Sequence, residues 1–383
     1  MPDVIVIGGG ITGLATACAL ADAGLGVSLM EARQLGAMAS SWTLGGVRQS
    51  GRDPAELPLA RAAVAQWAEW HHVLGAETGY RRRGNLRLAR NAAEAEAIRA
   101  MVAAQRALGL NLDFLADIKA IRAIAPAIGD GVVAASFCPD DGHADPDMTI
   151  SALAGHARRK GVILQERMPA LRLLVQGGRV IGVETPVGHL HADRVIVACG
   201  LQSAALIQPL GLALPMVAKR VCVLQTTPQP PAFEQVFGVA NADCAGRQEI
   251  DGRFRVTTGI GDWPGDPARW TEATLRPSFA DTAALIARTV PILPLLAASG
   301  LERVWGGLID LTPDALPVLD APAGCPGLVI GAGFSGHGFG IGPVSGQILR
   351  ALALGETTPF DLAPFRLDRF FPEAVQMPLT LHG

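Results

Sequence analysis

The sequence is poor in lysine and has no closely spaced pair of cysteines. Lysine accounts for three of the 32 basic residues, and the formal net charge of −3 offers no basic surface for nucleic acid or an anionic membrane. The six cysteines stand at positions 18, 138, 199, 222, 244 and 325, so no C-x-x-C pair exists to hold zinc or an iron–sulfur cluster. We therefore expect no metal, no nucleic-acid partner and a reduced, cytoplasmic setting.

The sequence also lacks a segment with the composition of a membrane span. Residues 4–21 carry no charge, but Asp3 precedes them, no basic stretch leads into them, and glycines interrupt them. The uncharged stretch at 201–218 contains glutamine, proline and glycine. With 49% hydrophobic residues among 383, the chain is long enough for about two domains with substantial cores.

The first thirty residues have the pattern of a dinucleotide-binding βαβ unit. A β-branched run at 4–7 ends in glycines, and Gly8, Gly10 and Gly13 occupy G-x-G-x-x-G positions before a small-residue helix. A second strand at 27–30 ends in Glu31, whose carboxylate can accept hydrogen bonds from ribose hydroxyls. The motif alone could be a structural turn, but the flanking strands, the helix and the acid favour a dinucleotide, with its phosphates at the helix N-terminus.

Hydrophobic periodicity and turn residues predict the remaining elements. The small-residue segment 38–49 has no helical period, which predicts a loop packed closely against another group. Trp67 and Trp70 share the apolar face of a helix at 58–73, which favours the core over a substrate cage. The other expected helices are 87–108, 148–160, 279–290 and 343–354, and the other expected strands are 162–164, 171–175, 180–184, 194–198, 221–225, 253–258 and 328–330.

Two polar candidates have simpler explanations than a reactive site. The segment 138–146 places His143 among three aspartates, but the spacing fits no defined set of metal ligands. A solvated turn that caps the next helix explains it better. Cys199 follows an apolar strand and has no base paired with it in the sequence, so we interpret it as a small residue and not as a redox thiol.

A second glycine cluster follows the strand at 328–330. Gly331, Gly333 and Gly336 again fit G-x-G-x-x-G, which by itself would allow a separate NAD(P) site. The helix that follows leads into no second strand that could carry an acid to a ribose. We expect this element to return to the first sheet and aim a helix N-terminus at the far end of the same cofactor, where a flavin gathers negative charge on reduction.

These motifs together resemble the FAD-dependent D-amino acid oxidase superfamily over essentially the whole chain. Within it the sequence is most similar to the branch that contains sarcosine oxidase, the flavin subunits of sarcosine and opine oxidases, and hydroxyproline dehydrogenase. The resemblance rests on the N-terminal glycines with Glu31, the loop at 39–49, the strand end at 196–200, Thr312-Pro313-Asp314, the segment 333–339 and the ending at 361–370. It implies an α/β protein of the glutathione-reductase type. A split Rossmann-like FAD domain would take residues 1–84, 145–215 and 320–383, and a mixed-sheet α+β substrate domain would take 85–144 and 216–319.

The resemblance also implies which residues contact FAD. The N-terminal motif and Glu31 would hold the ADP half, and the backbone N–H groups of the C-terminal loop would face the pyrimidine edge of the flavin. His337 would reach the substrate as a catalytic residue, although a helix-capping role is the alternative. The implied cofactor contacts are Gly8, Gly10, Ile11, Thr12, Gly13, Glu31, Ala32, Arg33, Ser40, Ser41, Gly45, Gly46, Ala170, Ala198, Cys199, Gly200, Gly333, Gly336, His337, Gly338 and Phe339.

Three departures from the family pattern change what we expect of the site. Gly307 stands where monomeric sarcosine oxidases attach flavin through cysteine, which implies noncovalent FAD. Ile309 stands where glycine oxidase has a carboxylate-binding arginine, so we expect Arg48 to serve as the substrate anchor, with Arg220 and Arg247 as weaker candidates and Trp305 as a further contact. No lysine near 253–261 matches the one that helps sarcosine oxidases to activate oxygen.

The expected function is FAD-dependent oxidation of an amino acid or N-substituted amino acid. Hydride would pass from the α-carbon to flavin N5, and the imine would hydrolyse in water. The electron acceptor would be O₂ or a partner protein. One alternative is a flavin subunit of a heteromeric amine, opine or hydroxyproline dehydrogenase with little activity alone, and another is an NAD(P)H-dependent flavin monooxygenase.

Overall fold

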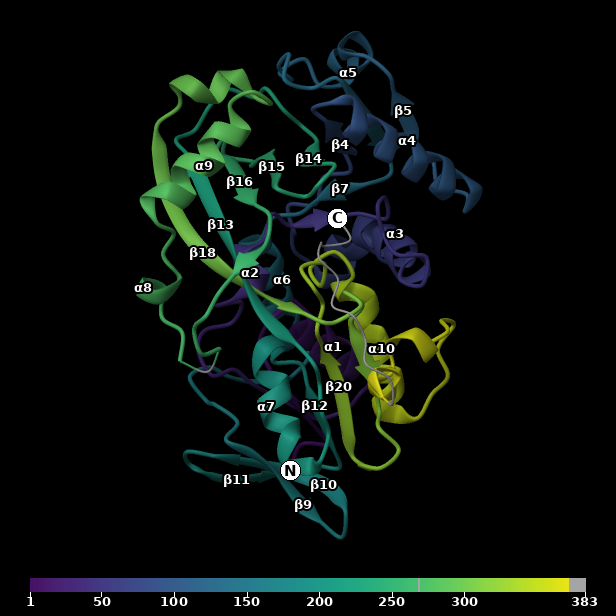
Figure 1. Cartoon of the computed structure of the whole chain (residues 1–383). Coiled ribbons are helices and arrows are strands. Elements are labelled where there is room, and N and C mark those ends of the chain that lie inside the picture. The colour runs from purple at the N-terminus through teal and green to yellow at the C-terminus, as the bar shows by residue number, and fades with distance from the viewer. Residues whose placement is uncertain (268, 372–383) are drawn as a thin grey trace.

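A six-stranded sheet forms the lower half of the molecule in Figure 1. The computed structural model describes residues 1–267 and 269–371. The strand order is β19-β20-β12-β1-β2-β8, and neighbours run parallel except β19, which is antiparallel to β20. The strands are β1 Val4–Ile7, β2 Val27–Met30, β8 Ile163–Gln165, β12 Arg194–Val197, β19 Val318–Asp320 and β20 Leu328–Ala332. Both glycine motifs therefore follow strands of one sheet, as the sequence predicts.

Both faces of this sheet are covered, which explains why its strands are apolar throughout. Val4 and Val6 pack into the core on one face, and Ile5 and Ile7 pack into the core on the other. The first face carries α1 Ile11–Asp22, α3 Leu57–Leu74, α6 Pro146–Arg159 and α10 Gly342–Leu354. The second carries a three-stranded sheet, β9 Arg172–Gln176, β10 Arg179–Thr185 and β11 Gly188–His191, together with α7 Ser203–Ile207.

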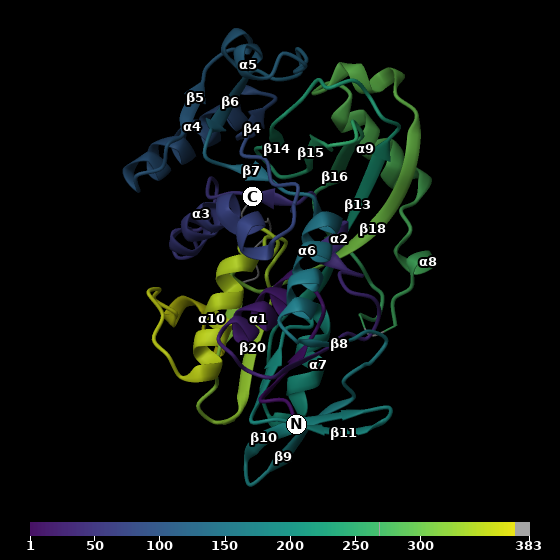
Figure 2. The same ribbon diagram turned by 180° about the vertical axis from the view of Figure 1, so that it is seen from behind.

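A nine-stranded mixed sheet forms the upper half of the molecule in Figures 1 and 2. Its order is β17-β13-β16-β15-β14-β4-β6-β5, and β18 pairs with β13. Its strands are β4 Asn85–Ala89, β5 Asp113–Leu115, β6 Ala134–Cys138, β13 Val217–Thr226, β14 Val236–Val239, β15 Cys244–Gln248, β16 Phe254–Thr258, β17 Gly261–Asp262 and β18 Leu301–Leu311. The helices of this half are α4 Ala92–Ala107, α5 Ile118–Ile124, α8 Glu272–Leu275 and α9 Phe279–Thr289. All nine strands fall within 85–144 and 216–319, which supports the two-domain division that we propose from the sequence.

The prediction of a helix over 87–108 is wrong at its start. Arg87 lies in the middle of β4, and α4 begins only at Ala92, after Asn91 has capped the helix by accepting the Glu94 N–H at 2.9 Å. Pairing of β4 with β6 and β14 decides the conformation of this segment, and such long-range pairing overrides local helix propensity. The predicted loop at 38–49 likewise contains the single-turn helix α2 Ala39–Trp42 and the short strand β3 Gly46–Val47.

The segment 138–146 caps a helix as predicted, but it is not solvated. Asp145 accepts the Met148 N–H at 2.9 Å and begins α6. Asp141 and His143 are buried, because β7 Gly142–His143 pairs with β3 in the interior. Within residues 1–267 and 269–371, no cluster of His, Cys, Asp and Glu could hold a metal ion. Nor is any helix of this described part both long and apolar enough to cross a membrane.

Candidate functional site

A cavity of about 720 Å³ lies between the two sheets. One side is formed by Ile7, Glu31 and Ala198, at or just beyond the carboxyl ends of β1, β2 and β12. The opposite side is formed by strands of the nine-stranded sheet, including Val221, Val223 and others on β14 to β16. Doubly wound sheets bind ligands at this edge, where the strand order reverses between the central strands.

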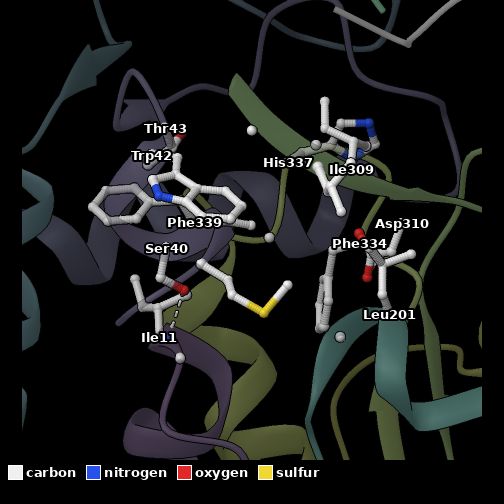
Figure 3. A pocket seen from close by; sticks show the side chains of 18 of the residues that line it. Ile11, Ser40, Trp42, Thr43, Leu201, Ile309, Asp310, Phe334, His337 and Phe339 are labelled. Carbon is white, nitrogen blue, oxygen red and sulfur yellow. Dashed lines mark hydrogen bonds between the residues drawn. The ribbon is translucent and has the colours of Figure 1, made fainter. Parts of the chain in front are cut away.

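The N-terminal glycine turn brings backbone donors to the cavity. A side chain at Gly8, whose φ is +114°, would lie 2.3 Å from the Ala198 carbonyl oxygen, so only glycine fits there. α1 begins at Ile11 without a side-chain cap, and Gly10, Ile11 and Thr12 line the cavity. The Ile11 N–H donates to Ser40 Oγ at 2.9 Å (Figure 3). The first turn of this helix therefore offers backbone N–H groups to an anion.

Glu31 is fixed at the end of β2 by two backbone hydrogen bonds. Its Oε2 accepts the Gly9 N–H at 2.7 Å, and its Oε1 accepts the Arg33 N–H at 2.8 Å. A carboxylate oxygen has lone pairs left after one such bond, so both oxygens can still accept from hydroxyl groups. Glu31 lines the cavity together with Ala32 and Arg33.

The C-terminal glycine loop lines the same cavity through Gly336, His337, Gly338 and Phe339. The first turn of α10 does not line it, so the backbone of the loop, and not the helix N-terminus that the sequence predicts, faces the ligand space. Asp310 Oδ2 holds the start of the loop by accepting the N–H groups of residues 333 and 334 at 3.0 and 3.3 Å. Burial raises the pKa of Asp310 to about 6.

His337 lies against a fully buried carboxylate. Its Nδ1 is 3.2 Å from Oε2 of Glu56, the residue that precedes α3, and Figure 3 shows the imidazole beside Ile309 at one end of the cavity. Burial lowers the pKa of His337, although the Glu56 carboxylate acts in the opposite direction. The imidazole is therefore neutral at neutral pH and can accept a proton. The alternative of a helix-capping role is not supported, because α10 begins at Gly342 without a side-chain cap.

Arg48 lines the cavity, whereas the two weaker arginine candidates do not. Arg220 forms an ion pair with Asp281 at 2.8 Å. Arg247 is fully buried behind the wall, where its Nε donates to the Leu44 carbonyl oxygen at 2.5 Å. These contacts give both side chains a structural role. Neither is placed to bind a ligand in this cavity.

The residues behind two of the three departures from the family pattern line the cavity. Gly307 and Ile309 line it from β18. Trp305 lies outside the lining, where its ring packs against the guanidinium groups of Arg255 and Arg303. None of the lysines in the described chain lines the cavity. Lys219, the lysine nearest in sequence to residues 253–261, donates a hydrogen bond from its Nζ to Asp262 Oδ1 at 2.5 Å.

Most of the implied cofactor contacts share this one cavity. Those in its lining are Gly8, Gly10, Ile11, Thr12, Glu31, Ala32, Arg33, Ser40, Gly46, Ala170, Ala198, Cys199, Gly200, Gly336, His337, Gly338 and Phe339. Four lie just outside it: Gly13, Ser41, Gly45 and Gly333. Gly13 instead packs α1 against the glycine turn, since a Cβ there would lie 1.9 Å from the Gly8 carbonyl oxygen. Burial raises the pKa of Cys199 to about 11, which agrees with a thiol that is not reactive.

The sequence analysis missed several polar residues of the lining, among them Arg52, Asn85, Arg87 and Asp310. Asn85 and Arg87 share one face of β4, while Leu86 and Leu88 enter the core on the other face. That alternation of polar and apolar residues is a strand signal, and a shorter sequence window would have found it. Arg52 follows Arg48 by four residues and gave no such signal.

A family model described as "FAD dependent oxidoreductase" (DAO) matches residues 3–352. This chain belongs to the DAO family of FAD-dependent oxidoreductases. The donor set of the cavity fits that cofactor. The uncapped first turn of α1 suits a pyrophosphate, Glu31 suits the ribose hydroxyls, and the backbone of the 336–339 loop lies along the same cavity. FAD is therefore the cofactor of this DAO protein.

Curated relatives resemble this DAO chain over almost its whole length. It is 27% identical to 4-methylaminobutanoate oxidase (formaldehyde-forming) of Paenarthrobacter nicotinovorans over 96% of the chain, but over only 45% of that protein. A bifunctional ThiO/ThiG protein of Nostoc sp. is likewise matched over only 57% of its length, so the chain spans about half of these two relatives. Sarcosine oxidase subunit beta of Arthrobacter sp. is 26% identical, and the match covers 96% of this chain and 91% of that protein.

A solved structure confirms the fold of the DAO chain. The crystal structure of glycine oxidase from Geobacillus kaustophilus superposes with a TM-score of 0.89 at 24% identity, and the match covers 97% of this chain and 99% of that one. The predicted α/β architecture, with a Rossmann-like sheet beside a mixed sheet, is confirmed by this match and by the two observed sheets.

Proposed function

We propose that this FAD-dependent oxidoreductase oxidises an amino acid or an N-substituted amino acid at the carbon that carries the nitrogen. The observation that carries the proposal is a single cavity lined by both glycine loops, by Arg48 and by His337. The relatives named above as sarcosine oxidase subunit beta and 4-methylaminobutanoate oxidase support this substrate class. Bound FAD would supply the hydride acceptor, and hydrolysis of the imine product would follow in water.

The side chains of this chain would prepare the substrate in three ways. Arg48 would pair with the substrate carboxylate and fix its position through a forked hydrogen bond. The neutral imidazole of His337 would take the proton that an amine must lose before oxidation, and the adjacent Glu56 would stabilise the charged imidazole. Val221, Val223 and the other apolar residues on the substrate-domain wall would exclude water.

Anaerobic reduction of the holoprotein tests this function. Amino acids, N-methyl amino acids and opines should bleach the oxidised flavin absorbance near ~450 nm, and NADPH alone should not. Reduction by NADPH but by no amine would instead support a monooxygenase or a reductase. Arg48→Ala should raise the KM for carboxylated amines by the equivalent of about 2–4 kcal/mol. An unchanged KM excludes the anchor role of Arg48.

The electron acceptor and the assembly are part of the same proposal. The absence of a lysine from the described lining supports a dehydrogenase that passes electrons to a partner, alongside an oxidase that uses O₂. The name of the Arthrobacter relative, a subunit beta, supports a heteromeric setting. Glycine at position 307 supports noncovalent FAD, and the six free cysteines support a cytoplasmic location. Oxygen consumption against turnover with an artificial acceptor separates the two kinds of enzyme.

A further inference from the structure

Three arginines meet at the end of the cavity near His337. Arg48 follows β3, Arg52 lies four residues later, and Arg87 lies in β4 of the nine-stranded sheet. All three line the cavity. Arg52 Nε donates to the Arg48 carbonyl oxygen at 3.4 Å, which joins two of them. Burial and the charges of the other two arginines lower the pKa of Arg48 to about 9, and burial and Arg52 lower the pKa of Arg87 to about 10.

The two carboxylates nearest to this cluster are engaged elsewhere. Asp141 accepts the Gln49 N–H at 2.8 Å and the Ser50 N–H at 3.2 Å, and it also accepts the Ser50 hydroxyl. Glu56 lies against Nδ1 of His337. Both carboxyl groups act on Arg48 through space.

Arg48 and Arg87 therefore present guanidinium groups that the protein leaves available. Across residues 1–267 and 269–371, neither group makes an ion pair or a hydrogen bond with another part of the chain, and both line the cavity. Both side chains are half-buried, and once a ligand fills the cavity and displaces its water, each guanidinium is stable only when an anion or an acceptor pairs with it. Each fork matches one carboxylate in a bidentate arrangement.

We propose that the substrate is an amino acid or N-substituted amino acid with two carboxylates, one bound by Arg48 and the other by Arg87. This inference rests on the proposed amine oxidation and specifies its substrate class. Arg48 directly follows β3, a strand of the small β3-β7 sheet, and Arg87 lies in β4 of the nine-stranded sheet, so a substrate that joins them bridges two separate segments of the cavity wall.

The charge of the cluster favours a second carboxylate. The three guanidinium groups outnumber the two nearby carboxyl groups, Asp141 and Glu56, so the cluster carries an excess of positive charge. A simple amino acid enters with one carboxylate and one ammonium, adds no net charge and leaves this excess in place. A substrate with two carboxylates and one ammonium adds one negative charge and reduces the excess. Transfer of the ammonium proton to His337 inside the cavity leaves this total unchanged.

Binding of non-reducible acids to the holoprotein tests the proposal without turnover. Perturbation of the flavin spectrum gives a Kd for glutarate, with two carboxylates, and for butyrate, its analogue with one. Loss of one buried charge pair costs about 2–5 kcal/mol, so glutarate should bind at least ~30-fold more tightly than butyrate. Equal Kd values would overturn the proposal and would indicate that both arginines share a single carboxylate.

Substitution of Arg87 assigns the second carboxylate. Arg87→Met should weaken glutarate at least ~30-fold more than it weakens butyrate, and Arg87→Lys should recover part of the loss. Arg83→Met changes an exposed arginine that precedes β4 and should alter neither Kd. Equal weakening of both acids by Arg87→Met in a variant that keeps its FAD would overturn the assignment.

A reduction assay separates this inference from the function on which it rests. Aminodicarboxylates such as iminodiacetate and glutamate should reduce the flavin at least ~30-fold more efficiently, in kcat/KM, than sarcosine and glutamine, their analogues with one carboxylate. Reduction by both kinds with equal efficiency would overturn the dicarboxylate inference alone. Failure of every amine to reduce the flavin would overturn the proposed function, while the acid-binding measurements would still stand.

Discussion

The close packing of α1 against the glycine turn predicts that alanine at position 13 destabilises the protein. An alanine Cβ at position 13 would lie 1.9 Å from the Gly8 carbonyl oxygen and 3.5 Å from Val6. The nearest atom belongs to the backbone, so no side-chain rotation can relieve the overlap. Either α1 or the turn must move by more than 1 Å, since a Cβ atom essentially never lies closer than 3.0 Å to another heavy atom.

The cost of Gly13→Ala can be separated from helix propensity with a matched variant. Gly155 lies within α6, and a Cβ there meets only the flexible end of Arg159 at 3.4 Å. Gly155→Ala should therefore raise the free energy of unfolding by about 0.5–1 kcal/mol, as expected for a helical glycine. Gly13→Ala would gain the same increment but should lose about 1–3 kcal/mol to overpacking. The two variants should therefore differ by about 1–3 kcal/mol in urea unfolding of the apoprotein.

The same movement should weaken FAD binding, because the turn carries the donors for the pyrophosphate. The loss of one hydrogen bond to a charged group costs about 1.5–3 kcal/mol, so Gly13→Ala should raise the Kd of FAD about 10- to 100-fold. Fluorescence titration of the apoprotein measures that Kd, with Gly155→Ala as the control. Equal stabilities and equal Kd values for the two variants would refute the assignment of Gly13 to this packing contact.

Three further predictions follow from single contacts. Glu31→Gln should raise the Kd of FAD about 10- to 100-fold by fluorescence titration, because one charged acceptor is lost; Glu166→Gln, which also removes a carboxylate that accepts a backbone N–H, should leave the Kd unchanged. Burial lowers the pKa of His143 from 6.5 to about 3. The unfolded chain therefore takes up a proton near pH 6.5 while the folded chain does not, and the free energy of unfolding decreases as the pH is lowered from 6.5 toward 3. His143→Gln should lose about 2–3 kcal/mol less than wild type between pH 7 and pH 4.5 in urea unfolding, and an equal loss would contradict the burial argument. Trp67→Phe should cost about 1–3 kcal/mol of unfolding free energy, because it leaves the Gly340 carbonyl oxygen without the indole donor at 2.7 Å; an unchanged thermal midpoint would show that this bond contributes nothing.

The parts of the fold that the sequence predicts correctly are those fixed by neighbours in the chain. The β1–α1–β2 unit follows from an apolar run, a glycine turn and a strand within thirty residues. The strands predicted at 171–175 and 180–184 are joined at Gly177-Gly178, whose positive φ angles of 57° and 76° suit a tight hairpin. The strand around Arg87 depends instead on pairing with segments about 50 and 150 residues away, which no local window contains.

The candidate site likewise contains residues that the local sequence predicts and residues that only the fold brings together. Glu31 and the backbone donors at the start of α1 belong to one local motif, so their place could be predicted without a structure. Arg48 was identified from a loop expected to run beside the flavin. Its neighbour Arg87 reaches the cavity only because β4 pairs within the nine-stranded sheet. Arg220 was a weaker candidate than Arg48 in the sequence, and only the structure shows that Asp281 already neutralises it.

Helix α3 belongs to the core and also positions the C-terminal loop of the site. Glu56 precedes the helix and touches His337, while Trp67 within it donates to the Gly340 carbonyl oxygen and stacks on Phe339, with ring centroids 5.3 Å apart. These contacts hold the C-terminal loop at His337 and at residues 339–340. The indole that the sequence assigns to the core is indeed buried, yet its polar atom serves the loop. Because α3 packs against α6 and α10, which cover one face of the six-stranded sheet, these contacts tie the position of the loop to the core on that face.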